Sequence, residues 1–302
     1  MPVKIVVTGG TGFLGAALVD ALRRDGHDVT VLTRRPARAT GEVQWNPTAG
    51  LDVWARSFEG AGAVINLAGE PIAGGRWTAA RKRAILASRL EATSGAVAAL
   101  RAAGTAGATL LSGSAIGYYG TPGDAPLDES SPPGRDFLAT VCHEWEAEAR
   151  EADARVVLLR TGLVLGRGGG ALQQLALPFQ FFAGGPLGSG RQVMSWIHRD
   201  DWIAMVRWAL ANPDVHGPLN LTAPAPVTNR EMATALGRAL QRPSFMPAPA
   251  FALRLALGEM ADAMVLNGQR VIPRAAMNGG FEFQFASLDE ALGEIYGLGL
   301  RT

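Results

Sequence analysis

The sequence predicts an α/β protein with a doubly wound parallel sheet, the Rossmann architecture, and a smaller C-terminal substrate lobe. In its first half, short runs of Val, Ile and Leu alternate with helical stretches, as expected for parallel strands buried on both faces. A glycine-rich turn directly follows the first of these runs. After about residue 166 the texture changes, with a glycine-rich stretch and four prolines between residues 213 and 226.

Each element follows from a local pattern. The predicted strands cover residues 4–8, 28–33, 62–67, 108–112 and 155–165, and the first helix covers 12–25. A later helix is predicted over 229–241, with Asn229 as its N-cap and an apolar stripe along one face. We assign residues 1–165 and 194–221 to the dinucleotide-binding domain, and residues 166–193 and 222–302 to the smaller lobe.

Length and charge limit the function classes. The 302 residues suit one large α/β domain with an appended lobe. A net charge of +1 argues against nucleic acid or an acidic membrane as a partner. No apolar run approaches the roughly 18–20 residues of a membrane span, and no signal peptide is recognisable. We therefore expect a cytoplasmic protein that acts on a small-molecule substrate and is a candidate homodimer.

Cysteine and histidine usage argues against a metal centre. Cys142 is the only cysteine, so neither an intramolecular disulfide nor a Cys-rich metal site can form. The four histidines, at positions 27, 143, 198 and 216, show no metal-ligand spacing. We predict no bound metal, and we place Cys142 in the apolar stripe of a helix.

The turn after the first strand is a candidate dinucleotide-binding loop. It reads Gly9, Gly10, Thr11, Gly12, Phe13, Leu14, Gly15, which contains the pattern G-x-G-x-x-G. The pattern follows a strand and opens a helix, which is the context its mechanism requires. Glycines let the backbone approach a pyrophosphate, and the helix N-terminus offers unpaired N–H groups to the phosphates.

The end of the second strand predicts the choice of cofactor. NAD sites tend to place an acid there, whereas this strand ends Thr33-Arg34-Arg35 with no acid before Glu42. A guanidinium can bind a 2′-phosphate through two parallel hydrogen bonds. The alternative is that both arginines are solvated surface charges. We favour NADP(H) as the cofactor, with Arg34 rather than Arg35 as the ligand.

With these residues in hand, the chain resembles the extended and atypical short-chain dehydrogenase/reductases, the superfamily of sugar-nucleotide epimerases and dehydratases. The matching blocks run in order along most of the chain: Asn66-Leu67-Ala68-Gly69, Ser112-Gly113-Ser114-Ala115 with Tyr118-Tyr119-Gly120, Arg160-Thr161-Gly162-Leu163, and Trp196-Ile197-His198. Further blocks, such as Gly69-Glu70-Pro71-Ile72 and Ser88-Arg89, resemble an atypical subgroup often labelled "epimerase family protein", whose C-terminal domain has no assigned function.

The resemblance implies further cofactor-binding residues. They are Leu67, Ala68, Gly69, Glu70, Arg89, Ser112, Gly113, Thr161, Gly162 and Leu163. Glu70 either pairs with Arg89 or touches a ribose. Arg89 either binds phosphate or polarises a carbonyl from its helix, or else forms a surface salt bridge.

One departure from the superfamily concerns its catalytic machinery. Its usual acid/base is the Tyr of a Tyr-x-x-x-Lys pair, in which the Lys lowers the Tyr pKa. This chain has three tyrosines and two lysines, Lys4 and Lys82, and no tyrosine has a lysine four residues later. The helix expected to carry the pair, residues 137–146, contains neither residue type. The usual catalytic pair is therefore absent.

Other residues are candidates to replace that pair. Ser114 occupies the serine position of the superfamily, and Tyr118 or Tyr119 follows that strand within reach of a nicotinamide. His198 is either a general base or a structural histidine, and we favour the structural role. Arg191 either meets an anionic substrate or is a loop charge. We predict Ser114 and Tyr118 as the catalytic residues.

These observations predict an NADP(H)-dependent oxidoreductase of unassigned substrate. A non-catalytic NADP(H)-binding regulatory or scaffold protein is the first alternative. A sugar-nucleotide epimerase is the second, and the missing Tyr/Lys pair argues against it.

Overall fold

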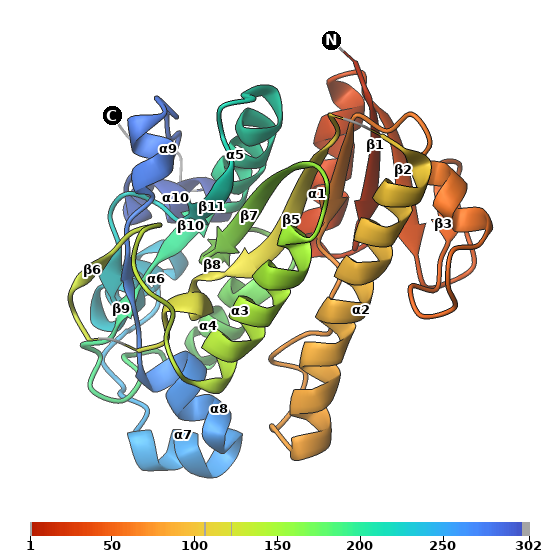
Figure 1. Ribbon diagram of the computed structural model, residues 1–302. Coiled ribbons are helices and arrows are strands. Elements are labelled where there is room, and N and C mark those ends of the chain that lie inside the picture. Colours follow the sequence, from red (N-terminus) through yellow and green to blue (C-terminus); the bar gives the residue numbers. More distant parts are fainter. Residues whose placement is uncertain (1, 106, 122, 298–302) are drawn as a thin grey trace.

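The computed structural model describes residues 2–105, 107–121 and 123–297 (Figure 1). Its main sheet has seven parallel strands in the order β11-β7-β5-β4-β1-β2-β3. They are β1 (Lys4–Thr8), β2 (Asp28–Thr33), β3 (Glu42–Gln44), β4 (Ala63–Asn66), β5 (Thr109–Ala115), β7 (Arg155–Thr161) and β11 (Gly217–Leu221). The strand order reverses at β1, and open α/β sheets bind ligands at such a point. The predicted doubly wound fold is confirmed.

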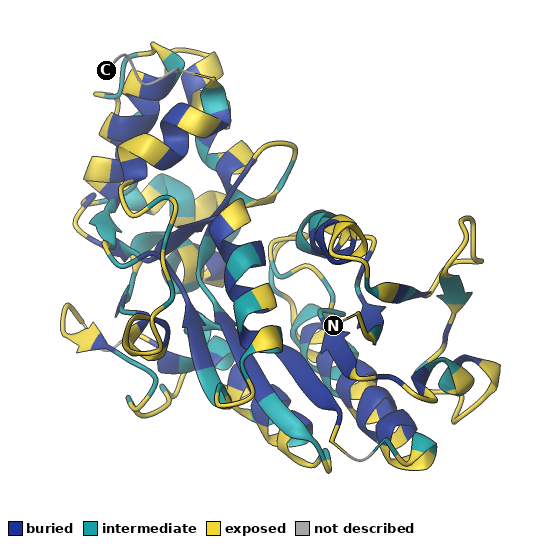
Figure 2. Cartoon of the chain, turned by 90° about the horizontal axis from the view of Figure 1, so that it is seen from above, coloured by how far each residue is buried: buried dark blue, intermediate teal, exposed yellow. Residues whose placement is uncertain are grey.

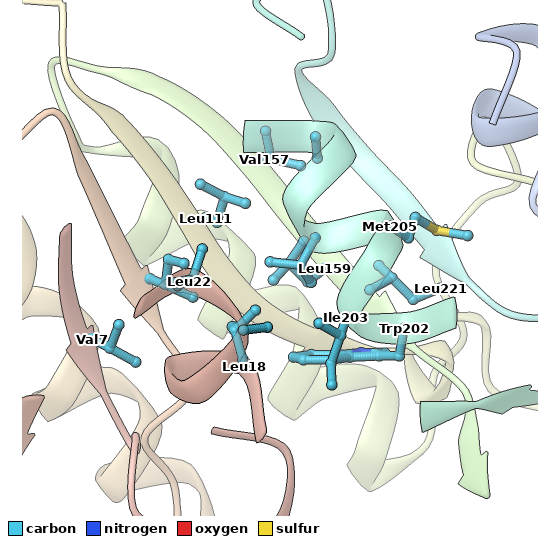
Figure 3. Close-up of a cluster of buried hydrophobic side chains, with 14 of the residues drawn as sticks. Val7, Leu18, Leu22, Leu111, Val157, Leu159, Trp202, Ile203, Met205 and Leu221 are labelled. Carbon is cyan, nitrogen blue, oxygen red and sulfur yellow. The ribbon is translucent and has the colours of Figure 1, made fainter. Parts of the chain in front are cut away.

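Helices cover both faces of the sheet. On one face, α1 (Phe13–Arg24) and α5 (Arg199–Ala211) bury a cluster that includes Leu18, Leu22, Leu159 and Trp202 (Figure 3). On the other face, α2 (Ala79–Ala103) packs on the sheet beside α3 (Phe137–Arg150) (Figure 1). The strands between them are buried along most of their length (Figure 2), which explains their uniformly apolar sequence.

The C-terminal part forms its own apolar cluster. Helices α4 (Gly170–Gln180), α6 (Asn229–Leu240) and α10 (Leu288–Tyr296) supply most of it, and Leu165, Trp196 and Ala223 complete it. The remaining helical segments are α7 (Ala250–Leu257), α8 (Glu259–Ala261), α9 (Arg274–Asn278), the 3-10 helices η1 (Val53–Phe58) and η2 (Ile116–Tyr119), and the π-helical turn η3 (Asp262–Leu266).

Three two-stranded sheets connect these parts. They pair β8 (Leu163–Leu165) with β10 (Trp196–His198), β9 (Val193–Met194) with β12 (Val227–Thr228), and β6 (Pro126–Leu127) with β13 (Arg270–Val271). Among the described residues, no helix combines the length and the apolar character needed to cross a bilayer.

Two sequence predictions need correction. The strand expected over 155–165 is divided at Gly162, where the chain leaves β11 and joins β10. A Cβ at Gly162 would lie 2.6 Å from the Ser195 carbonyl oxygen, so this crossing requires glycine. Helix α6 is capped by Thr228, which forms a capping box with Glu231. The predicted cap, Asn229, is the first helical residue, and its side-chain oxygen accepts a hydrogen bond from the Leu187 N–H.

The turn between β1 and α1 is packed too closely for most side chains. A Cβ at Gly15 would overlap the Gly9 carbonyl oxygen and lie 2.8 Å from the Gly10 Cα. At Gly12, in contrast, the nearest atom to a Cβ is the Gly9 carbonyl oxygen at 3.4 Å, an ordinary van der Waals contact. The fold therefore requires glycine at position 15 but not at position 12.

We predict that Gly15→Ala lowers the free energy of unfolding, whereas Gly12→Ala leaves it nearly unchanged in the absence of ligand. Overpacking against rigid backbone costs about 1–3 kcal/mol. Thermal unfolding followed by circular dichroism measures both variants against the wild type. Equal melting temperatures for the two variants would contradict this account of the turn.

Candidate functional site

The predicted cofactor residues follow strands of the main sheet whose carboxyl ends meet at one edge. The turn after β1 and the start of α1 contain Gly9, Gly10, Thr11, Gly12, Phe13, Leu14 and Gly15. Arg34 and Arg35 follow Thr33, the last residue of β2. Leu67, Ala68, Gly69 and Glu70 follow β4, and Ser112 and Gly113 lie within β5. Because all these strands are parallel and adjacent, the sheet brings these segments together.

The turn after β1 leaves backbone N–H groups without side-chain caps. Gly9 has a φ of +69°, and a Cβ there would lie 2.7 Å from the Leu67 carbonyl carbon, so the turn passes directly against the end of β4. No side chain caps α1, and its hydrogen bonding begins with the Ala16 N–H donating to the Gly12 carbonyl at 2.9 Å. The N–H groups of its first turn thus lack intrahelical acceptors and fit a pyrophosphate.

A buried chain of hydrogen bonds fixes this edge. The Thr8 hydroxyl donates to the Asn66 side-chain oxygen at 2.6 Å, and the Asn66 amide donates to the Thr93 hydroxyl at 2.8 Å. The Trp145 indole N–H also donates to the Thr93 hydroxyl, at 2.9 Å. These hydrogen bonds therefore connect the carboxyl ends of β1 and β4 to helices α2 and α3.

The carboxylate of Glu70 lies between two arginines. Arg34 contacts it at 3.0 Å and Arg81, on α2, at 3.4 Å. The hydrogen bond from Arg34 is the main reason why the pKa of the Glu70 carboxyl lies below its usual value. The sequence also allowed an ion pair between Glu70 and Arg89, and this is wrong for the carboxylate, because Arg89 contacts only the main-chain oxygen of Glu70. Arg34 does have a neighbouring carboxylate, supplied by the loop after β4.

Arg89 is buried, so the surface salt bridge considered for it is also wrong. Its Nη1 donates to the main-chain oxygens of Ile85 at 2.9 Å and Glu70 at 3.2 Å. Its guanidinium lies 5.0 Å from the centre of the Trp145 ring, and burial lowers its pKa. Arg89 also packs against Gly69, where a Cβ would meet its side chain at 3.2 Å. It thus holds the loop after β4 on helix α2.

A buried ion pair between Glu146 and Arg160 contacts the catalytic candidates Ser114, Tyr118 and Tyr119. Glu146, on α3, is fully buried and accepts hydrogen bonds from Arg160 Nε at 2.7 Å and Nη2 at 2.9 Å. The Ser114 hydroxyl donates to the same carboxylate at 2.7 Å. Burial opposes the charge on Arg160, but its hydrogen bonds to Glu146 and Tyr119 outweigh this and raise its pKa. The proton of Ser114 is therefore committed to Glu146.

The two adjacent tyrosines differ in their surroundings. Tyr119 is buried, donates to the Asn220 side-chain oxygen at 2.7 Å and accepts from Arg160 at 3.0 Å. Burial raises the pKa of Tyr119 to about 12, although Arg160 opposes the shift. The Tyr118 ring lies over the Arg160 guanidinium, 3.5 Å from its central carbon. The Tyr118 hydroxyl makes no hydrogen bond within the described part of the chain, which leaves it available to a ligand.

The other candidates have structural surroundings. His198 is buried, with Nδ1 accepting from the Asp200 N–H and Nε2 lying 3.1 Å from a Glu294 carboxylate oxygen. Cys142 is buried as predicted, and burial raises its pKa to about 11. Arg191 is exposed on its loop. Within the ranges that the structure describes, no three His, Cys, Asp or Glu side chains form a group able to hold a metal ion.

The residues predicted at the end of β7 have other partners. Thr161 accepts a hydrogen bond from the Trp202 indole at 3.1 Å, and Gly162 and Leu163 carry the chain from β7 to β8.

Ser112, predicted as a cofactor residue within β5, is fully buried, and its hydroxyl has no partner among the described residues.

Helix α2 also contacts the C-terminal lobe. Arg76, in the loop before the helix, donates to the Leu255 carbonyl at 3.1 Å, near the end of α7. Lys82 forms an ion pair with Glu259 of α8. Two cations thus join the segment that follows Glu70 to the lobe.

Sequence reasoning missed Glu146, Arg160 and Arg81 as site residues. Arg160 is a charge inside an apolar strand, and Glu146 lies beside Cys142 and Trp145 on the buried face of its helix. Both positions signalled a buried polar group. Arg81 carried no such signal, because it resembles any surface arginine near a helix start.

We predict that Glu146→Leu lowers the free energy of unfolding by about 3–5 kcal/mol, because it leaves Arg160 buried without its anion. Glu144→Leu, on the same helix, is the matched control and should have a much smaller effect. Urea titration followed by tryptophan fluorescence measures both. A cost for Glu146→Leu no larger than that of the control would show that the ion pair does not hold this region together.

Comparison with known proteins agrees with this geometry. Residues 5–221 match the NAD dependent epimerase/dehydratase family, and residues 248–295 match a domain of unknown function, DUF1731. The chain is 45% identical to the epimerase family protein SDR39U1 homolog, chloroplastic, of Arabidopsis thaliana, over 95% of this chain and 85% of the relative.

Two solved structures are also similar. The human epimerase family protein SDR39U1, crystallised with NADPH, superposes with a TM-score of 0.89 and 37% identity, covering 97% of this chain and 99% of the human one. A nucleoside-diphosphate sugar epimerase from Corynebacterium glutamicum gives a TM-score of 0.80 and 33% identity, over 99% of this chain and 59% of that one. The glycine turn, the sheet order and these likenesses together show that the chain belongs to the NAD dependent epimerase/dehydratase family.

Proposed function

We propose that the chain is an NADP(H)-dependent oxidoreductase acting on a small-molecule substrate without a Tyr-x-x-x-Lys pair. The observation that carries the proposal is the uncapped glycine turn of α1 with Arg34 at the end of the neighbouring strand β2. The NADPH in the human relative supports the same cofactor here. When bound, the nicotinamide supplies or accepts a hydride.

The chain's own residues have separate tasks in this proposal. The first turn of α1 binds the pyrophosphate, and Arg34 binds the 2′-phosphate. Arg89 and the buried Asn66 hold the loop after β4 in place. Asn66 and Arg89 are fixed by hydrogen bonds that exist without ligand, so the loop after β4 needs little ordering when the cofactor binds.

The hydrogen bonds distinguish the catalytic candidates. Ser114 donates to Glu146, so its free lone pairs suit it to accept a hydrogen bond from substrate rather than to donate one. Tyr119 is engaged on both sides by Asn220 and Arg160. Tyr118 is therefore the proton donor in this proposal, and Ser114 orients the substrate.

The same contacts favour a second candidate, an NADP(H)-binding regulatory protein without turnover. The cation beside both tyrosines is Arg160, which is already paired with Glu146 and cannot exchange protons. Among the described residues, no proton-exchanging partner like the family's lysine therefore assists Tyr118. The sugar-nucleotide epimerase remains a third candidate because of the family and the Corynebacterium relative. Lys82, the lysine that follows the β4 loop, pairs with Glu259 on the lobe, which argues against its service to a tyrosine.

Gly12→Val tests cofactor binding. A branched side chain should block the phosphates, while the fold tolerates a Cβ at this position. We expect NADPH binding by calorimetry to disappear and the circular dichroism spectrum to remain normal. Undiminished binding would mean that the turn does not hold the pyrophosphate.

Turnover tests the reaction. We expect no epimerised or dehydrated product from UDP-, GDP- or dTDP-sugars with NADP(H), analysed by chromatography. With a panel of carbonyl compounds we expect slow, saturable loss of NADPH absorbance, reduced at least about tenfold by Tyr118→Phe, since acid catalysis contributes roughly 10²–10⁴-fold. Ser114→Ala is the companion variant.

Each alternative predicts a different result. NADPH binding without turnover across the panel would favour the regulatory protein. An epimerised product in stoichiometric excess, lost in Ser114→Ala, would favour the epimerase.

A further inference from the structure

Glu70 places an internal anion at the predicted adenosine end of the site. Its carboxylate is contacted by Arg34 at 3.0 Å from β2 and by Arg81 at 3.4 Å from α2. Arg34 follows strand β2 and Arg81 lies on helix α2, and both guanidiniums contact the same carboxyl group. Two arginines that share one anion form the same arrangement that binds phosphate groups in proteins.

The main chain of Glu70 is anchored, so only its side chain is free to leave. Its N–H donates to the Ser88 hydroxyl at 3.0 Å, and its carbonyl accepts from Arg89 at 3.2 Å. Arg81 is also held in place, because it donates to the Pro71 carbonyl. Its buried Nε has no partner among the described residues, so this donor remains to be satisfied. The Arg34 side chain, in contrast, is 71% exposed and can reorient without disturbing the core.

We propose that the Glu70 carboxylate occupies the position of the NADPH 2′-phosphate, and that Arg34 and Arg81 together form the phosphate subsite after Glu70 turns away. This inference rests on the proposed NADP(H) function and assigns Arg81 and Glu70 to it. A phosphate monoester carries more charge than a carboxylate and offers three acceptor oxygens. It therefore satisfies both guanidiniums better than Glu70 does.

The displaced carboxylate stays close to the phosphate, because the main chain of Glu70 does not move. It therefore opposes NADPH binding, both as a competitor for the arginines and as a like charge. NADH lacks the 2′-phosphate and leaves the three side chains as they are. Glu70 thus lowers the preference for NADPH over NADH, and both arginines raise it.

The test is the ratio of NADPH to NADH affinity, measured by calorimetry, because the two molecules differ only in the 2′-phosphate. We expect Glu70→Gln to raise the ratio by about threefold to tenfold at low salt. Arg34→Ala should lower it by roughly tenfold to a hundredfold, and Arg81→Gln by about tenfold. NADH affinity should change little in all three variants, which shows that the rest of the site is intact.

Matched controls separate this effect from general electrostatics. Arg83→Gln removes an exposed arginine from the same helix, and Glu42→Gln removes a carboxylate from the neighbouring strand β3. Both should leave the ratio unchanged. A ratio that falls or stays constant in Glu70→Gln, or an Arg81→Gln variant that behaves like Arg83→Gln, overturns this inference alone. A wild-type protein that binds neither cofactor overturns the proposed function as well.

Discussion

The ion pair between Glu146 and Arg160 is the interaction on which the candidate active site depends. It lies between α3 and the main sheet, with the Arg160 side chain only 2% exposed and Glu146 fully buried. Ser114 donates a hydrogen bond to Glu146, and Tyr119 accepts one from Arg160. The Tyr118 ring stacks on the Arg160 guanidinium. Through Asn220, which binds both Tyr119 and the Ile272 carbonyl, the network reaches the C-terminal part. A charged pair inside a protein is costly unless every group is satisfied, so these neighbours are held in place together.

This network also limits the chemistry. In the superfamily that the chain resembles, a lysine keeps a tyrosine partly ionised. Here the cation beside the two tyrosines is an arginine, which stays protonated in proteins and cannot exchange protons. Arg160 is already paired with Glu146, which also pairs with the half-exposed Arg150. The surroundings suit hydrogen bonding and orientation of a ligand better than repeated proton transfer, which is why slow reduction and regulation remain the two main candidates.

Local patterns predicted well where the physical cause is local. The first two strands have the predicted bounds, and helix α1 begins and ends within one residue of its prediction, because a buried run and a glycine turn are each read within a few residues. The partner of Arg34 could not be predicted, since Glu70 is 36 residues away and follows β4, which is separated from β2 by β1 in the sheet. Arg160 and Glu146 were each visible as a charge in an apolar setting, but only the packing of α3 on the sheet shows that they meet.

The apolar cluster of the C-terminal part has a consequence for how the chain unfolds. Leu165 and Trp196 lie in β8 and β10, which pair in a small sheet just after the main sheet in the sequence. They are buried by α6 and α10 near the other end of the chain. Removing the C-terminal helices would expose this apolar surface and would leave Arg76 and Lys82 without their contacts on the lobe. We therefore expect the two parts to unfold together as a single cooperative unit, so that the nucleotide-binding half could not be excised as an independent module.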